Sequence, residues 1–172
     1  MQVMQTQNEN LKIVLYPDQV LTNPTQPVLD FGIAKQFVPA MRKFVGNPGV
    51  LGLAANQIGL PYSICVVRLS ELGIKELINP VVQLFEGKNL DYEGCLSMPG
   101  VKSMVARSAS VRVEFFDMDC NKMILNLSNM DARVVQHEVD HLNGVMMIDR
   151  ISTYHRGEAL KKWKLEKRRL QK

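Results

Sequence analysis

The 172-residue sequence lacks any long apolar run, and no stretch reaches the 18 residues that a membrane-spanning helix needs. Its first twelve residues have neither the basic nor the apolar region of a secretory signal, and no Arg-rich transit peptide is visible. Only three cysteines occur, so they cannot all pair with one another, and nothing indicates an oxidising compartment. We therefore expect a cytoplasmic protein without a membrane partner.

Repeats, low-complexity tracts and linkers are also absent. The hydrophobic content of 46% and the charged content of 22% are ordinary for a globular protein. A chain of this length most simply forms one domain with a sizeable core. We expect a single catalytic domain over residues 1–172 that begins with a polar lead-in at residues 1–10, and we expect it to be a monomer.

Positive charge is concentrated at the C-terminal end. From Arg156 onward the chain has eight Lys or Arg and two Glu, a net of +6, whereas the rest has 13 basic and 15 acidic residues, a net of −2. The pattern predicts a basic helix over residues 152–172. Two interpretations stay open: a helix packed on the body through Leu160, Trp163 and Leu165, or a surface that meets a polyanion. The body shows no nucleic-acid-binding pattern, so no DNA partner is expected.

The order of the expected elements indicates the fold class. Helical spacing predicts a helix within residues 28–45, kinked or restarted at Pro39, and the glycine-rich segment 47–61 is typical of a loop or an irregular strand. Runs of β-branched and aromatic residues predict strands, after which a turn at 117–122 leads into 123–127. The strands are at 62–69, 76–85 and 110–117. Because they form a block, we predict an α+β fold with antiparallel or mixed sheets around a central metal-binding helix, with an N-terminal helix and a C-terminal basic helix.

The segment QHEVDHLNG, residues 136–144, supplies the first candidate for chemistry. His137 and His141 stand one helical turn apart, so their imidazoles can reach a common ion, and Glu138 beside the first can carry protons. In a chain with three histidines, this spacing predicts a divalent-metal site.

The boundaries of this helix are also visible. Ser128 followed by Asp131 resembles a capping box, and Gly144 is a plausible C-terminal cap. Between them, Met130 and Val134 share the face that carries the two histidines.

Two histidines leave a third ligand to be found. The position of a third histidine in one class of zinc peptidases is occupied by Met147. A glutamate from further along the chain could come only from Glu158 or Glu166, both in the basic tail. Upstream, Cys95 lies in the tight segment DYEGCLSMPG, where a thiolate would be a good soft ligand. Spacing alone leaves Cys95 open between a ligand and a buried structural cysteine, as Cys65 is expected to be.

Three separated motifs resemble those of the peptide deformylase family. GLAANQ (52–57) matches most of the first motif, EGCLS (93–97) matches the second, and QHEVDHLNG matches the third. The first glycine of the first motif is replaced by Val50, and Lys102 stands near a position where many members have arginine. The resemblance implies the ligand set Cys95, His137 and His141.

The resemblance also implies an activity. It implies a metal-dependent hydrolase that removes the N-formyl group from the N-terminal formylmethionine of nascent polypeptides and releases formate. One divalent ion per chain is implied, Fe²⁺ by preference, with Zn²⁺ or Ni²⁺ compatible with the ligands. A metal-bound hydroxide would attack the formyl carbonyl while Glu138 shuttles the proton. The Gln57 side chain and the Leu96 backbone N–H would stabilise the oxyanion.

The same motifs imply where the substrate lies. A formylated peptide would run extended along the first two motifs, because Gly52 and Gly94 permit a close approach, with Glu93 beside them. Met130 and Val134 could line the slot for the methionine side chain, or serve only as core residues.

Two other functions stay open from the residues. One is a zinc peptidase or another metal-dependent amidase that uses the same helix. The other is a catalytically silent module that binds a ribosome or RNA through the basic tail. For the enzyme, the ribosome surface is a further expected partner of that tail, because the substrate emerges there.

Overall fold

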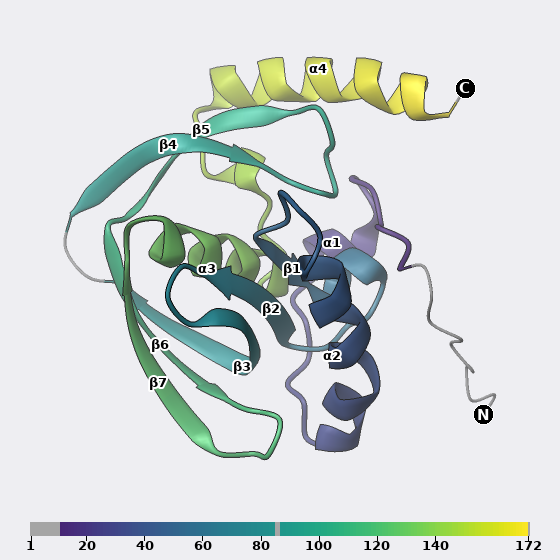
Figure 1. Ribbon diagram of the computed structural model, residues 1–172. Helices are drawn as coiled ribbons and strands as arrows, with labels where there is room; N and C mark the ends of the chain where they lie inside the picture. Colours follow the sequence, from purple (N-terminus) through teal and green to yellow (C-terminus); the bar gives the residue numbers. More distant parts are fainter. Residues whose placement is uncertain (1–10, 85–86, 172) are drawn as a thin grey trace.

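The computed structural model describes residues 11–84 and 87–171, so the expected lead-in at residues 1–10 lies outside the described residues. Within these described residues, four α-helices and seven strands follow one another. Figure 1 shows how they are arranged. The helices are α1 (Gln19–Thr22), α2 (Phe31–Val45), α3 (Asn129–Leu142) and α4 (Thr153–Leu170). The strands are β1 (Gly52–Ala54), β2 (Ile64–Leu69), β3 (Gly73–Leu84), β4 (Lys88–Gly94), β5 (Lys102–Ser108), β6 (Ser110–Phe116) and β7 (Lys122–Ser128).

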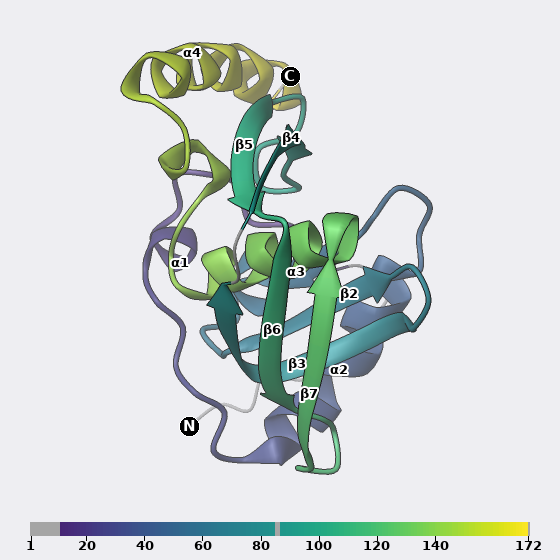
Figure 2. The same ribbon diagram turned by 90° about the vertical axis from the view of Figure 1, so that its left-hand side faces the viewer.

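The strands form two antiparallel sheets. Five strands pair in the order β1-β2-β3-β6-β7, and β4 pairs with β5 in a separate two-stranded sheet. Helix α3 lies between the two sheets, with α4 beyond the smaller one (Figures 1 and 2). This confirms the predicted α+β fold with a central helix and a basic helix at the C-terminal end.

Strand β2 of the larger sheet is apolar on both of its faces. Successive side chains of a strand point to opposite faces. Cys65 and Val67 join the cluster that packs beneath α3, whereas Ile64 and Val66 join the cluster beneath α2. Because helices cover both faces, the run Ile64–Val67 is apolar throughout and fully buried.

Helix α2 runs through Pro39 as a single helix, so the helix does not restart there. The carboxylate of Asp30 accepts a hydrogen bond of 2.8 Å from the backbone N–H of Gly32 and caps the first turn. The buried residues Val38, Met41 and Val45 form the helix stripe that covers the sheet.

The expected capping box of α3 is wrong in its contacts. Ser128 is the N-cap residue, but its side chain makes no capping hydrogen bond. The carboxylate of Asp131 instead accepts hydrogen bonds from the backbone N–H (3.0 Å) and hydroxyl (2.7 Å) of Ser70, at the end of β2. At the other end, Gly144 adopts φ +72°, and a Cβ there would lie 2.7 Å from the carbonyl oxygen of Thr22, so the position requires glycine.

Strands β4 and β5 were not expected from the sequence. Burial alternates along β5 as in any half-covered strand, with Ser103, Val105 and Arg107 inward. The inward positions include Arg107 on β5 and Glu93 on β4, so charged side chains stand where an apolar pattern would have indicated strands.

Helix α4 is anchored by one aromatic side chain. Trp163 is 4% exposed, and its indole N–H donates a 3.1 Å hydrogen bond to the carbonyl oxygen of Tyr16. Leu160 packs against the same cluster, but Leu165 is 58% exposed, so the expected packing is confirmed for two of the three residues. No helix in the described part of the chain has the length and apolar character needed to cross a bilayer.

Trp163→Ala should lower the free energy of unfolding by about 3–5 kcal/mol, because it removes a buried aromatic side chain together with its hydrogen bond. Denaturant titration followed by circular dichroism measures the change. The control is Leu165→Ala, which alters an exposed side chain of the same helix and should change stability by no more than about 0.5 kcal/mol. Equal stabilities for the two variants would contradict the anchoring role.

Candidate metal centre

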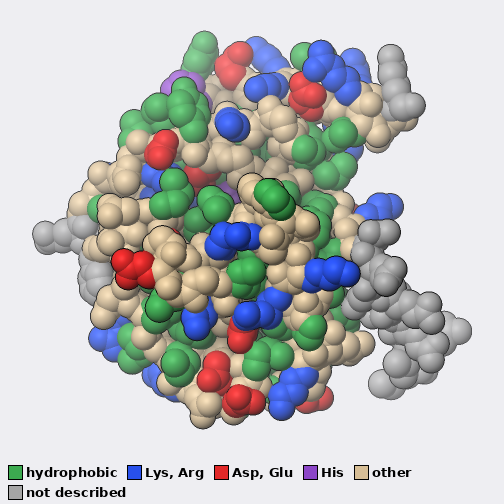
Figure 3. All heavy atoms as spheres, in the orientation of Figure 1, with side chains coloured by type: hydrophobic (Ala, Val, Ile, Leu, Met, Phe, Trp, Pro, Cys, Tyr) green, Lys and Arg blue, Asp and Glu red, His purple; other side chains and the backbone are tan. Residues whose placement is uncertain are grey.

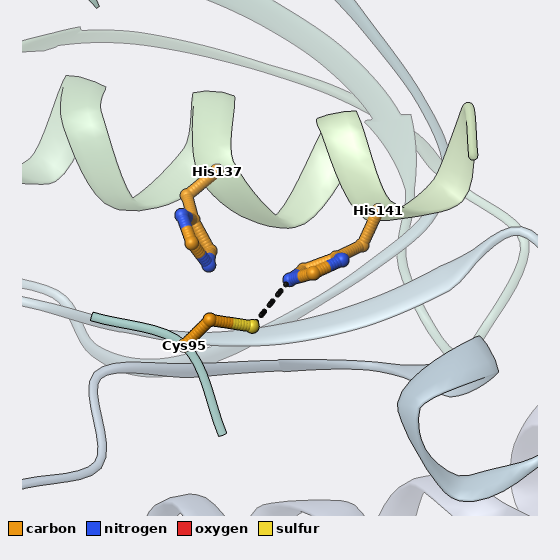
Figure 4. A group of neighbouring side chains, drawn as sticks. All are labelled: Cys95, His137 and His141. Carbon is orange, nitrogen blue, oxygen red and sulfur yellow. Dashed lines mark hydrogen bonds between the residues drawn. The ribbon is translucent and has the colours of Figure 1, made fainter. Parts of the chain in front are cut away.

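Three potential metal ligands meet where α3 faces the segment after β4. His137 and His141 project from the same side of α3 toward Cys95, as Figure 4 shows. One ligand atom from each of the three residues lies within 4.8 Å of the other two, and Cys95 Sγ is 3.2 Å from His141 Nε2. Cys95 and His141 are buried, and 12% of the His137 side chain is exposed. The structure therefore brings together the set that the motifs implied.

The donor set fits a divalent transition metal. Burial raises the pKa of the Cys95 thiol, but the charges and hydrogen bonds of His141 and His137 outweigh it, so the pKa falls well below its usual range. The sulfur is thus held as a thiolate, the form in which cysteine binds a metal. One thiolate and two imidazoles suit zinc, nickel or ferrous iron and leave room for a further ligand.

A buried carboxylate orients the first histidine. Glu93 Oε2 lies 2.9 Å from His137 Nδ1, so the other ring nitrogen of His137 is directed toward Cys95. Glu93 also accepts two hydrogen bonds of 2.9 Å from Arg107 and one of 2.6 Å from Arg133. Burial would raise the pKa of Glu93, but the hydrogen bonds from Arg107 and His137 outweigh it and hold the pKa well below its usual range.

The network continues to the end of α3. Arg107 also forms an ion pair with Asp140, whose carboxylate accepts a 2.9 Å hydrogen bond from Arg150 Nε. Glu93 was expected beside the substrate, and it does border the cleft, but its carboxylate is engaged by His137 and the arginines.

Sequence reasoning missed the arginines of this network. Arg133 stands four residues before His137, so helical periodicity places both on one face, and that spacing was an available signal. Arg107 and Arg150 had no comparable signal, because arginine is ordinarily a surface residue.

Gln57 and Leu96 lie beside the thiolate. The Gln57 amide donates to Cys95 Sγ at 3.5 Å and to Ser97 Oγ at 3.3 Å, and its oxygen accepts from the backbone N–H of Ala54 at 2.9 Å. The amide is thereby fixed with its NH₂ group toward the cluster. Within residues 11–84 and 87–171, the backbone N–H of Leu96 donates no hydrogen bond and is available to a ligand.

Glu138 is 5% exposed, and burial raises its pKa. Its Oε2 atom has no hydrogen-bond partner among the described residues, a costly state for a buried oxygen unless a ligand meets it. Gly52 leaves the space that the carboxylate fills, because a Cβ there would lie 2.3 Å from Glu138 Oε1. A carboxyl group with a raised pKa beside a metal site can accept and return a proton.

One cleft of about 700 Å³ joins most of the predicted site residues. Met130, 48% exposed, and Val134, 6% exposed, form part of its wall, and Val134 also belongs to the core. The predicted site residues that line the cleft are Gly52, Gln57, Glu93, Gly94, Cys95, Leu96, Met130, Val134, His137 and Glu138. His141 lies behind them and is fully buried.

The alternative third ligands lie elsewhere. Glu158 pairs with Lys161 and Glu166 pairs with Arg169, all on α4, and neither glutamate belongs to the cluster. The downstream-carboxylate arrangement that the zinc-peptidase alternative needs is therefore not formed.

Proteins of known sequence are similar to this chain over most of its length. The family model described as Polypeptide deformylase matches residues 10–157. A peptide deformylase of Aquifex aeolicus is 38% identical over 161 residues, which cover 88% of this chain and 93% of the relative. One from Brucella suis biovar 1 is 35% identical over 165 residues, which cover 88% and 90% respectively.

Solved structures agree with the sequence relatives. A crystal structure of a peptide deformylase from Legionella pneumophila superposes with a TM-score of 0.86 at 29% identity, covering 94% of this chain and 97% of that one. The enzyme from Thermus thermophilus gives a TM-score of 0.85 at 36% identity, with coverage of 92% and 96%. Fold, Cys-His-His cluster and sequence thus agree, and the chain belongs to the polypeptide deformylase family.

Proposed function

We propose that this chain removes the formyl group from the N-terminal formylmethionine of nascent polypeptides by hydrolysis, with Cys95, His137 and His141 holding one divalent ion. The observation that carries the proposal is a buried thiolate–imidazole cluster at the wall of a cleft that also holds the Glu138 carboxyl and the Gln57 amide. An acyl-transfer site needs these three functions in one place: a Lewis acid, a proton carrier and an oxyanion donor.

The residues divide the reaction among them. A divalent ion, when bound, would supply Lewis acidity, which activates water near neutral pH and polarises a carbonyl. Glu138 takes the proton from the attacking water and delivers it to the departing amine, so that formate and a free N-terminus result. Gln57 Nε2 and the Leu96 backbone N–H donate to the oxygen of the tetrahedral adduct. Loss of one such donor typically costs roughly 100- to 1000-fold in turnover.

The peptide would lie extended in the cleft. Gly94 borders it without a side chain, and Met130 and Val134 offer an apolar wall for the methionine side chain. Gly52 acts mainly by making room for Glu138, because any larger residue would displace the carboxylate. We assign Glu93 the orientation of His137 and not a contact with the peptide.

Ferrous iron is the native ion that we propose, and zinc and nickel are the alternatives that the same donors accept. Metal analysis of protein purified from its host without oxygen would decide among them, and a predominance of zinc would overturn the proposal. We also propose that the protein is cytoplasmic and monomeric. Light scattering of the pure enzyme tests the monomeric state.

A second proposal concerns the outward face of α4. Lys and Arg side chains gather over this helix at the top of Figure 3. Lys164 and Arg168 are exposed and form no ion pair among the described residues, so their charges are free for phosphate. We propose that α4 docks on the ribosome surface, which would place the enzyme where formylated chains emerge.

The metal-loaded enzyme should release formate from formyl-Met-Ala and should leave acetyl-Met-Ala intact, because the extra methyl group crowds the attacked carbonyl. Cys95→Ala should lose both the metal and this activity, whereas Cys120→Ala, at an exposed cysteine, should retain both. Formate assays and metal analysis on the same samples give the answer. Turnover by Cys95→Ala with stoichiometric metal would contradict the ligand set.

Glu138→Gln should keep its metal and lose roughly 100- to 10,000-fold in kcat, because the amide preserves the shape of the carboxyl group but cannot accept a proton. Circular dichroism confirms that the variant is folded, and metal analysis confirms its loading. A metal-loaded variant with near wild-type kcat would remove Glu138 from the mechanism.

Lys164→Glu/Arg168→Glu should weaken binding to purified ribosomes at low salt. In magnitude, the slope of the logarithm of the binding constant against the logarithm of the salt concentration should fall by about one for each side chain that contacts a phosphate. Point substitutions are preferable to truncation, because truncation removes the anchor Trp163. The matched control is Lys35→Glu/Lys43→Glu, which changes the net charge equally on the exposed side of α2. Equal ribosome affinity for both double variants would eliminate docking through α4.

A further inference from the structure

Two lysines from different elements line the catalytic cleft. Lys102 is the first residue of β5, and Lys162 lies in the third turn of α4. Both side chains are exposed, and neither ammonium group makes a hydrogen bond or an ion pair within residues 11–84 and 87–171. Two neighbouring cations of α4 are engaged: Lys161 pairs with Glu158 and Arg169 pairs with Glu166. Two free ammonium groups therefore share the cleft.

The position of Lys162 is set by packing. Glu166, one turn further along α4, touches the turn before β5, since a Cβ on Gly100 would lie 3.0 Å from Glu166 Cγ. Residues four apart share a helix face, so Lys162 is directed toward the same wall. Trp163 fixes the helix through Tyr16, whose backbone N–H donates a 3.0 Å hydrogen bond to the carbonyl oxygen of Ser97. Lys162 is thus tied to the segment that carries the thiolate.

Lys102 lies over the expected path of the substrate. It is the cross-strand partner of Gly94, and a Cβ on Gly94 would lie 3.9 Å from Lys102 Cγ. Gly94 immediately precedes Cys95, so a peptide that leaves the metal centre along Gly94 passes beneath the lysine stem.

Among the described residues, the acids at the cleft are engaged elsewhere or buried. Glu93 is bound to arginines and His137, and Glu138 is buried beside the metal cluster. Glu166, which lies against Gly100 at the edge of the cleft, is paired with Arg169. The mouth of the cleft is therefore cationic, and an anionic group on the substrate would find complementary charge there.

Resting on the deformylase activity proposed above, we propose that Lys102 and Lys162 together select nascent chains that carry an Asp or Glu side chain a few residues after the formylmethionine. Helix α4 then contributes to specificity through its cleft side as well as to docking through its outward side. Exposed pairs of this kind are individually weak, so the two lysines together should change kcat/KM by roughly three- to tenfold at low salt.

The test uses formylated pentapeptide amides with Glu or Gln placed in turn at the third, fourth and fifth positions. Amidation removes the terminal carboxylate, so any preference for Glu comes from the side chain, and a parallel free-acid series measures the other source. Wild-type enzyme should favour Glu over Gln at one position or more, through KM and not kcat, with an advantage that falls as salt rises. Lys162→Gln and Lys102→Gln should each lower the Glu-to-Gln ratio.

A charge swap and a control complete the design. Lys162→Glu should favour Lys over Gln at the position where wild-type enzyme favours Glu. Lys164→Gln, which removes an exposed charge of α4 outside the cleft, should preserve the wild-type ratio. A ratio near one for wild-type enzyme at every position, or the wild-type ratio in Lys162→Gln, would overturn the selection while the deformylase activity stands. Absence of formate release from every peptide would overturn the activity itself, and the selection with it.

Discussion

The buried ion-pair network around Glu93 is the constraint on which the site depends. Glu93, Arg107, Arg133 and Asp140 are each at most 6% exposed, although charged side chains are rarely buried. Taking such groups out of water costs several kcal/mol per ion, and only dense pairing offsets it. Glu93 meets this condition with two arginines and His137. The network joins β4, β5 and α3, so the same contacts hold the smaller sheet against α3 and orient His137.

The catalytic arrangement follows from that junction. Once β4 is held against α3, the chain after Gly94 delivers Cys95 to the two histidines, and Gln57 reaches the sulfur from the turn after β1. The absence of a side chain at Gly52 lets Glu138 remain buried beside the cluster. Each group is fixed by a hydrogen bond or by close packing, and such preorganisation lets a site stabilise developing charge without reorganising.

Helix α4 forms part of the wall of the site. Its inward residue Trp163 is connected through Tyr16 to Ser97, so the helix is part of the wall of the site and not an appendage. The basic side chains of this helix lie in two places: Lys162 borders the cleft, whereas Lys164 and Arg168 are exposed outside it. A single basic helix thereby serves two proposed contacts, one with the nascent chain and one with the particle that makes it.

The sequence was sufficient for features that depend on local pattern. Periodicity placed α3 and its histidines, and composition placed β2, β3, β6 and β7 within a few residues of their bounds. It was insufficient for β4 and β5, because buried charges at Glu93 and Arg107 replaced the apolar alternation on which strand prediction rests. The capping box predicted from Asp131 was wrong because Ser70, the partner of its carboxylate, is distant in sequence. Cys95 could be assigned from motif resemblance but not from spacing, because its approach to α3 depends on that unforeseen sheet.

X-ray absorption at the metal edge tests the central claim most directly, because it reports the atoms bound to the ion. Nickel-loaded enzyme should show one sulfur and two imidazole nitrogens in the first coordination shell. Cys95→Ala prepared with excess nickel should show no sulfur contribution, whereas Cys120→Ala should match the wild type. A wild-type spectrum without sulfur, or a sulfur contribution that survives in Cys95→Ala, would contradict the assignment of Cys95, His137 and His141 to a single ion.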